Sequence, residues 1–150
     1  MSGPTQLMIK ANGINLNVAE QGQENQNAPM VLLCHGFPEG WYSWRHQLEA
    51  LAAAGYHAVA PDMRGYGKSD KPEAIDQYTI FHMVGDLIGV LDAFEAKSAI
   101  IVGHDWGAGI AWLAARLRPD RFRAAAILSV PYRPRSEARR QWTGRIATAF

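Results

Sequence analysis

The chain has 150 residues, of which 48% are hydrophobic and 19% charged, a composition typical of one packed globular domain and not of a disordered chain. Fifteen Lys and Arg residues against fourteen Asp and Glu residues leave a net charge of +1, so there is no general attraction to nucleic acid or to an anionic membrane. The single cysteine, Cys34, excludes an internal disulfide. Because we find neither a signal-peptide pattern nor a membrane-length apolar run, we expect a cytoplasmic protein.

The chain begins with the pattern of a β-hairpin. Apolar and polar residues alternate over 7–9 and again over 14–18, and Asn12-Gly13 between them is a strong signal for a two-residue turn. The unbroken apolar run at 30–34 follows a polar loop and predicts a strand covered on both faces.

Helices and strands then alternate, which predicts an α/β fold with a mostly parallel sheet and right-handed crossovers. Thr79 is placed to cap a helix, and Gly55 is placed to end one. In chain order we expect a helix from 41 to 54, a strand at 57–60, a loop at 64–78, a helix after 79 with Met83, Val84, Leu87, Ile88 and Leu91 on its inner face, a strand at 99–102, a helix at 107–117 and a strand at 124–130.

The segment Gly103-His104-Asp105-Trp106-Gly107 joins a predicted strand directly to a predicted helix. It has the G-x-S-x-G pattern of a nucleophile elbow with aspartate in the central position. Small flanking residues suit such a crowded turn, and a carboxylate nucleophile would form an ester intermediate. The alternative is an ordinary helix-capping aspartate between strand and helix.

A second segment, His35-Gly36-Phe37-Pro38, follows the first buried strand. A glycine-containing turn at a strand end can leave backbone N–H groups free to stabilise an oxyanion, together with the N–H of the residue after the nucleophile. The alternative is a tight turn with a structural role only.

With these segments, the chain resembles the N-terminal half of an α/β-hydrolase fold enzyme of the epoxide hydrolase family. The resemblance runs from the hairpin to about residue 135, and each motif is less specific than the combination. The matching segments are His35-Gly36-Phe37-Pro38-Glu39, Trp41-Tyr42-Ser43-Trp44-Arg45, Asp62-Met63-Arg64-Gly65-Tyr66-Gly67-Lys68-Ser69 and Gly103-His104-Asp105-Trp106-Gly107.

The resemblance implies a role for each matching site residue. Asp105 is expected to attack an epoxide carbon, and the backbone N–H groups of Phe37 and Trp106 are expected to form the oxyanion hole. The peptide before Pro38 is expected to be cis. We expect the residues that support this site to be His35, Gly36, Pro38, Gly103, His104 and Gly107, and the loop at 65–69 to be structural. The implied substrate is a small hydrophobic epoxide, with no metal or organic cofactor.

The family completes its site with an acid, a histidine base and two cap tyrosines. In this fold the histidine base follows the nucleophile in the sequence, but all five histidines lie before Asp105, so none can supply that base. Tyr132 lies too early to be a cap tyrosine. We therefore predict that residues 1–132 are the N-terminal part of the hydrolase core and that 133–150 begin an incomplete cap. A complementary C-terminal segment would supply the rest, and we expect residues 1–150 alone to be catalytically poor and marginally stable.

Two other functions remain open from the sequence. A haloalkane dehalogenase-like enzyme would use the same aspartate, with Trp106 holding the leaving halide, although Phe37 argues against it. The other is a catalytically incomplete paralogue that binds a partner.

Overall fold

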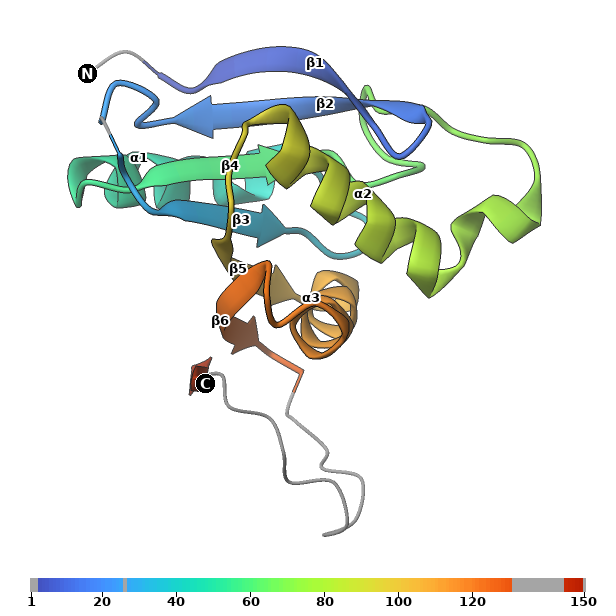
Figure 1. Ribbon diagram of the computed structural model, residues 1–150. Helices are drawn as coiled ribbons and strands as arrows, with labels where there is room; N and C mark the ends of the chain where they lie inside the picture. Colours follow the sequence, from blue (N-terminus) through green and yellow to red (C-terminus); the bar gives the residue numbers. More distant parts are fainter. Residues whose placement is uncertain (1–2, 26, 131–144, 150) are drawn as a thin grey trace, which may run out of the picture.

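The alternation of strands and helices builds one mixed sheet flanked by helices on both faces (Figure 1). The computed structural model describes residues 3–25, 27–130 and, by its backbone alone, 145–149. Across these residues the seven strands take the order β1-β2-β4-β3-β5-β6-β7, so the predicted fold class is confirmed. The strands are β1 (Thr5–Ala11), β2 (Ile14–Gln21), β3 (Met30–Cys34), β4 (His57–Pro61), β5 (Ala99–His104), β6 (Phe122–Leu128) and β7 (Arg145–Ala149).

Strands β1 and β2 form the predicted antiparallel hairpin, paired from Thr5–Glu20 to Ala11–Ile14. Asn12 and Gly13 have φ values of 49° and 81°. Two successive left-handed residues are what a two-residue hairpin turn needs, and asparagine and glycine tolerate that conformation best. Strand β2 also pairs antiparallel with β4, which joins the hairpin to the parallel part of the sheet.

The helices are α1 (Arg45–Ala53), α2 (Ile80–Ala93) and α3 (Trp106–Leu117), with short 3-10 helices η1 (Trp41–Trp44) and η2 (Ile75–Tyr78). Helix α1 therefore begins later than predicted, because its first turn is wound as η1. The stretch predicted to be loop contains η2, a tight turn of the kind that often leads into an α-helix. The cap at Thr79 is confirmed, since its side chain accepts a hydrogen bond from the His82 N–H.

Strand β6 runs over Phe122–Leu128, two residues earlier than the predicted 124–130. The turn after α3 closes sooner than expected, because Arg118 O accepts from the N–H groups of both Arg121 and Phe122. At the other end Ser129 has a φ of 61°, which turns the chain out of the sheet.

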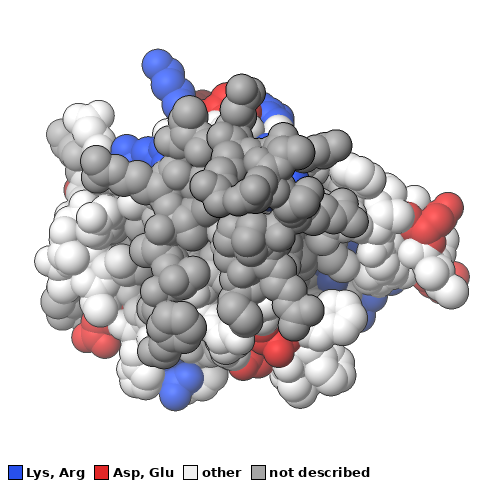
Figure 2. Space-filling model, turned by 90° about the horizontal axis from the view of Figure 1, so that it is seen from below, with Lys and Arg blue, Asp and Glu red and all other residues white. Residues whose placement is uncertain are grey.

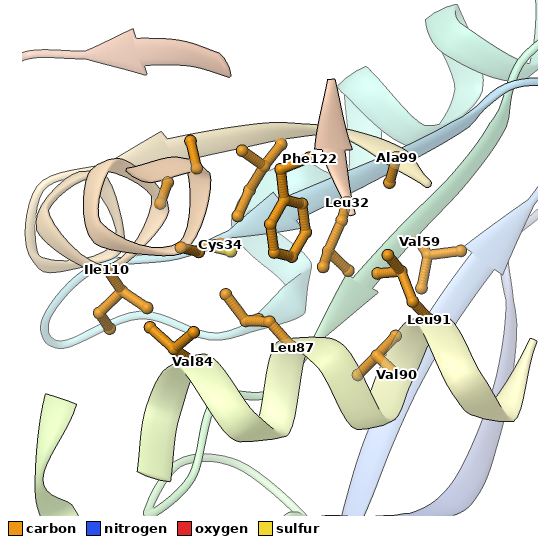
Figure 3. Packing of buried hydrophobic residues seen from close by; sticks show 14 of the residues in the cluster. Leu32, Cys34, Val59, Val84, Leu87, Val90, Leu91, Ala99, Ile110 and Phe122 are labelled. Carbon is orange, nitrogen blue, oxygen red and sulfur yellow. The ribbon is translucent and has the colours of Figure 1, made fainter. Parts of the chain in front are cut away.

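The larger core lies between the sheet and helices α2 and α3 (Figure 3). Phe122 and Leu32 from the sheet meet Leu87 of α2 there, and all three are almost fully buried. All five predicted inner-face positions of α2 pack in this core or against it, but the prediction missed that Asp86 also points inward. A smaller core on the opposite face of the sheet contains Leu48 of α1.

Parallel pairing of β3 with β5 sets the position of the candidate site. Cys34 lies opposite Gly103 in the register, so the two strands end side by side. The segments that follow them, 35–38 and 104–107, therefore meet at the same edge of the sheet. This is the edge where ligands bind in open parallel sheets.

On the part of the face in Figure 2 that is not covered by grey residues, acidic and basic side chains lie in small separate groups. None of the described helices is both long enough and apolar enough to cross a membrane. The cytoplasmic location stays a prediction. So does the division between core and cap after residue 132, because residues 131–144 lie outside the described part of the chain.

Candidate active site

Asp105 occupies a sharp turn between β5 and α3, with φ 53° and ψ −122°. A positive φ is unfavourable for a residue with a side chain, by about 1–3 kcal/mol, and such strain is concentrated at functional sites. The neighbouring glycines make the turn possible. A Cβ on Gly107 would collide with the backbone carbonyl oxygens of Cys34 and His35, and a Cβ on Gly103 would collide with the backbone of α3.

Two backbone N–H groups from separate segments meet at one oxygen of the Asp105 carboxylate. The Trp106 N–H donates to Oδ2 at 2.5 Å, and the Phe37 N–H donates to the same oxygen at 3.4 Å. Oδ1 accepts no hydrogen bond from the described residues. The two carboxylate oxygens are therefore unequal: Oδ2 is held by two donors, and Oδ1 has none among the residues that the structure describes.

Gly36 brings the Phe37 amide to this position. A Cβ on Gly36 would lie 2.5 Å from the Asp105 Cβ, so only glycine fits between the two segments. The Phe37–Pro38 peptide is cis, as predicted. The turn is closed by its own bonds: the Glu39 N–H donates to Gly36 O at 3.1 Å, and the Gly36 N–H donates to Glu39 Oε2 at 3.3 Å.

His35 lies behind this turn and is only 2% exposed. Its Nε2 accepts from the Met63 N–H at 2.9 Å, so Nδ1 carries the proton and donates to Gly36 O at 2.8 Å. Burial lowers the pKa of His35 and favours this neutral form. Because both ring nitrogens are occupied, His35 has no free nitrogen with which to act as a general base.

His104, the residue before Asp105, faces the other end of the same turn. Its Nδ1 lies 3.6 Å from Glu39 Oε2, and both side chains are about one-third exposed. His104 therefore links the elbow to the turn that carries Phe37.

Glu39, Met63 and Tyr66 also contribute to the site, and the sequence did not predict them as site residues. The Tyr66 ring packs edge-on against His35 at 4.9 Å between ring centres. Burial raises the pKa of Tyr66, and the negative charge of Asp105 raises it further. The motif at 62–69, which contains Met63 and Tyr66, could have pointed to them, but it predicted only a structural loop.

That loop is held by the buried carboxylate of Asp62. It accepts from Asn17 Nδ2 at 2.8 Å and from the Trp41 N–H at 2.9 Å. The Ser69 hydroxyl donates to Asp62 O at 2.6 Å. This network fixes the position of Met63, the next residue along the chain.

Aromatic side chains on either side of the carboxylate are open to solvent: Trp106 is 69% exposed and Phe37 is 63% exposed. Other tryptophans pack inside, since Trp44 is buried and Trp41 and Trp112 lie against the cores. The site as described thus offers an unequal carboxylate, two convergent amides and exposed aromatic surface. Such a set of donors can stabilise negative charge that develops at Oδ2.

Comparisons with known proteins identify the family to which the chain belongs. A family model described as the alpha/beta hydrolase fold matches residues 29–145. An epoxide hydrolase of Caballeronia sordidicola is 54% identical over 136 residues, which cover 91% of this chain and 40% of that protein. Epoxide hydrolase A of Mycobacterium tuberculosis is 53% identical over 137 residues, covering 91% of this chain and 42% of that protein.

Solved structures give the same result. Epoxide hydrolase A of Mycobacterium thermoresistibile superposes with a TM-score of 0.84 at 51% identity, covering 91% of this chain and 42% of that one. An epoxide hydrolase of Vigna radiata gives a TM-score of 0.83 at 46% identity, covering 92% and 44%. The chain thus spans less than half the length of these relatives. The matching family model, the shared fold and the relatives' identities together show that the chain belongs to the α/β-hydrolase fold family, with epoxide hydrolases among its relatives.

Proposed function

We propose that this chain carries the nucleophile and oxyanion hole of an epoxide hydrolase-like enzyme, with Asp105 as the nucleophile. The observation that carries the proposal is the convergence of the Phe37 and Trp106 N–H groups on Asp105 Oδ2, which leaves Oδ1 free to attack. The names of the relatives support an epoxide as the substrate.

The reaction balances in two steps. Asp105 Oδ1 forms a bond to an epoxide carbon while the ring C–O bond breaks, and the ring oxygen takes a proton from a donor in the complete site, or from water in this chain, to become a hydroxyl. Water then gives a proton to a general base and adds to the ester carbonyl, and negative charge develops on the oxygen held by the Phe37 and Trp106 amides. The bond to the alcohol oxygen breaks as that oxygen takes up the proton, so the diol leaves, and the acid formed on Asp105 loses a proton that replaces the one used in the first step. The net reaction converts an epoxide and water into a diol.

The second step needs a general base, and no histidine follows Asp105 in the sequence. Within the described residues His35 is fully hydrogen-bonded and His104 faces Glu39. We therefore expect the 150-residue chain to form the ester and to hydrolyse it very slowly. A complementary C-terminal segment would supply the base, its acidic partner and the donor to the ring oxygen.

Intact-mass measurement tests this after incubation with styrene oxide, whose benzylic C–O bond opens readily. The expected result is one adduct per chain that persists for hours, and no adduct on Asp105→Asn. Asp120→Asn is the matched control, because it removes an exposed carboxylate far from the elbow in sequence and should still form the adduct. Equal labelling of all three proteins, or sustained diol production by the chain alone, would contradict the proposal.

A haloalkane dehalogenase-like function is the second candidate, because the Trp106 side chain is 69% exposed and carries a ring N–H, the kind of donor that a leaving halide needs. Comparing diol formation with halide release in a full-length relative separates the two. Halide release as the faster reaction would favour the dehalogenase.

A further inference from the structure

We infer that His35 is a positioning residue whose ring clamps the turn at 36–39 against the loop at 62–66, and so aims the Phe37 N–H at Asp105 Oδ2. This inference rests on the proposed function of Asp105 and adds a residue to its machinery.

The turn's own hydrogen bonds do not locate it relative to Asp105, and the contact between His104 and Glu39 is a long one of 3.6 Å between side chains that are about one-third exposed. The two bonds between Gly36 and Glu39 join residues of the same turn, so they fix its shape and not its place. His35 instead connects the turn to a separate loop: Nδ1 donates to Gly36 O at 2.8 Å, while Nε2 accepts from the Met63 N–H at 2.9 Å. The ring is thus a rigid bridge of fixed length between two segments.

The bond to Gly36 O acts directly on the donor. The carbonyl of Gly36 and the N–H of Phe37 belong to one planar peptide group, so fixing the oxygen fixes the direction of the N–H. The ring itself is held in place, because it is buried and the Tyr66 ring packs edge-on against it.

The Phe37 donor is the one that depends on this clamp. Its distance to Oδ2 is 3.4 Å, whereas the Trp106 N–H is one residue from the carboxylate and lies at 2.5 Å. A hydrogen bond that long is lost when the turn moves by a few tenths of an ångström. Trp106 would keep its bond after such a movement, so the two amides report separately on the clamp.

Two substitutions each remove one end of the bridge. An asparagine side chain reaches about as far as the histidine Nδ1, so His35→Asn keeps the donor to Gly36 and loses the bond to Met63. Glutamine reaches about as far as Nε2, so His35→Gln keeps an acceptor for Met63 and loses the bond to Gly36. His46→Asn is the matched control, since His46 is an exposed residue of α1.

The first readout is NMR of the 15N-labelled chain as pH falls through the carboxylate range. In the wild type we expect the amide protons of Phe37 and Trp106 to shift together when the Asp105 carboxylate gains a proton, and we expect Asp105→Asn to abolish both shifts. Because Glu39 and Asp62 are also carboxylates near this turn, the measured quantity is the part of each shift that Asp105→Asn abolishes. We expect the Phe37 shift relative to that of Trp106 to fall by about half or more in both His35 variants, and to be unchanged in His46→Asn.

The second readout is cleavage of the styrene oxide ester by hydroxylamine. The amine adds to the ester carbonyl, the bond to the alcohol oxygen breaks, and a hydroxamate remains on Asp105 while the diol leaves. Weakening one oxyanion donor should slow this cleavage by about 10-fold or more in both His35 variants, with ester formation changed far less.

A wild-type amide ratio in either variant overturns the inference. Equal loss of the Phe37 and Trp106 shifts also overturns it, because the ring would then only maintain the fold. If the wild-type chain forms no ester, the proposed function fails, and the amide ratio still decides whether His35 is a clamp.

Discussion

The substitution Asp86→Asn should destabilise the chain by several kcal/mol, although Asp86 lies outside the candidate site. Asp86 is 2% exposed and its partner Arg64 is 1% exposed. Arg64 Nε donates to Oδ2 at 2.8 Å and Nη2 donates to Oδ1 at 2.7 Å, while Asn12 Nδ2 donates to Oδ1 at 2.9 Å. The carboxylate therefore joins the hairpin turn, the loop at 62–70 and helix α2.

The expected magnitude follows from the charge left behind. An asparagine cannot neutralise the guanidinium, and its amide NH₂ would face the N–H donors of Arg64. Removing one partner of a buried ion pair costs about 3–5 kcal/mol. With a urea slope of about 1–3 kcal/mol/M, the unfolding midpoint should fall by about 1 M or more.

Urea unfolding followed by tryptophan fluorescence measures this, and Asp120→Asn is the matched control. Asp120 accepts from Arg118 Nε at 2.8 Å and from Nη2 at 2.6 Å, the same two-bond geometry in an exposed position. Its loss should leave the midpoint unchanged, because water solvates both charges. Similar midpoints for the two variants would refute the reasoning that burial sets the cost.

Three further predictions follow from single positions. Gly107→Ala should destabilise the chain by more than about 2 kcal/mol, because the new Cβ would collide with backbone carbonyl groups. Gly109→Ala, on the open side of the same helix, should stabilise the chain by about 0.5–1 kcal/mol. Thermal unfolding of both variants checks this. Burial raises the pKa of Cys34 to about 12, so iodoacetamide at pH 8 should modify the native chain far more slowly than the urea-unfolded chain, and equal rates would contradict the burial. Burial lowers the pKa of His35 below its unfolded value of 6.5, so below that pH the unfolded chain binds a proton that the folded chain does not, and stability should be lost as pH falls below about 6.5. His35→Asn should make the urea midpoint depend less on pH in this range. An unchanged pH dependence would argue against the buried neutral ring.

Local signals in the sequence were enough to predict the elements that carry the site. Asn12-Gly13 specifies its turn by conformational preference alone, and the small residues around Asp105 indicate a crowded strand-to-helix junction. Parallel pairing then brings the ends of adjacent strands together, so the meeting of the segments after β3 and β5 followed from the fold class.

Contacts between distant segments could not be predicted in the same way. The bond from the Met63 N–H to the His35 ring joins residues 28 positions apart, and no local pattern encodes it. Arg64 lies in a loop rich in glycine and lysine, where sequence alone favours a solvated side chain. The burial of Arg64 depends on its ion pair with Asp86, which faces inward from α2. The apolar pattern of that helix does not indicate that one inward position carries a charge.

Peptide mapping by tandem mass spectrometry, after the chain has reacted with styrene oxide, tests the central claim most directly. We expect the added mass to lie on the Asp105 side chain, in the peptide that joins β5 to α3. Modification spread over exposed carboxylates such as Asp120, with Asp105 unmodified, would contradict it.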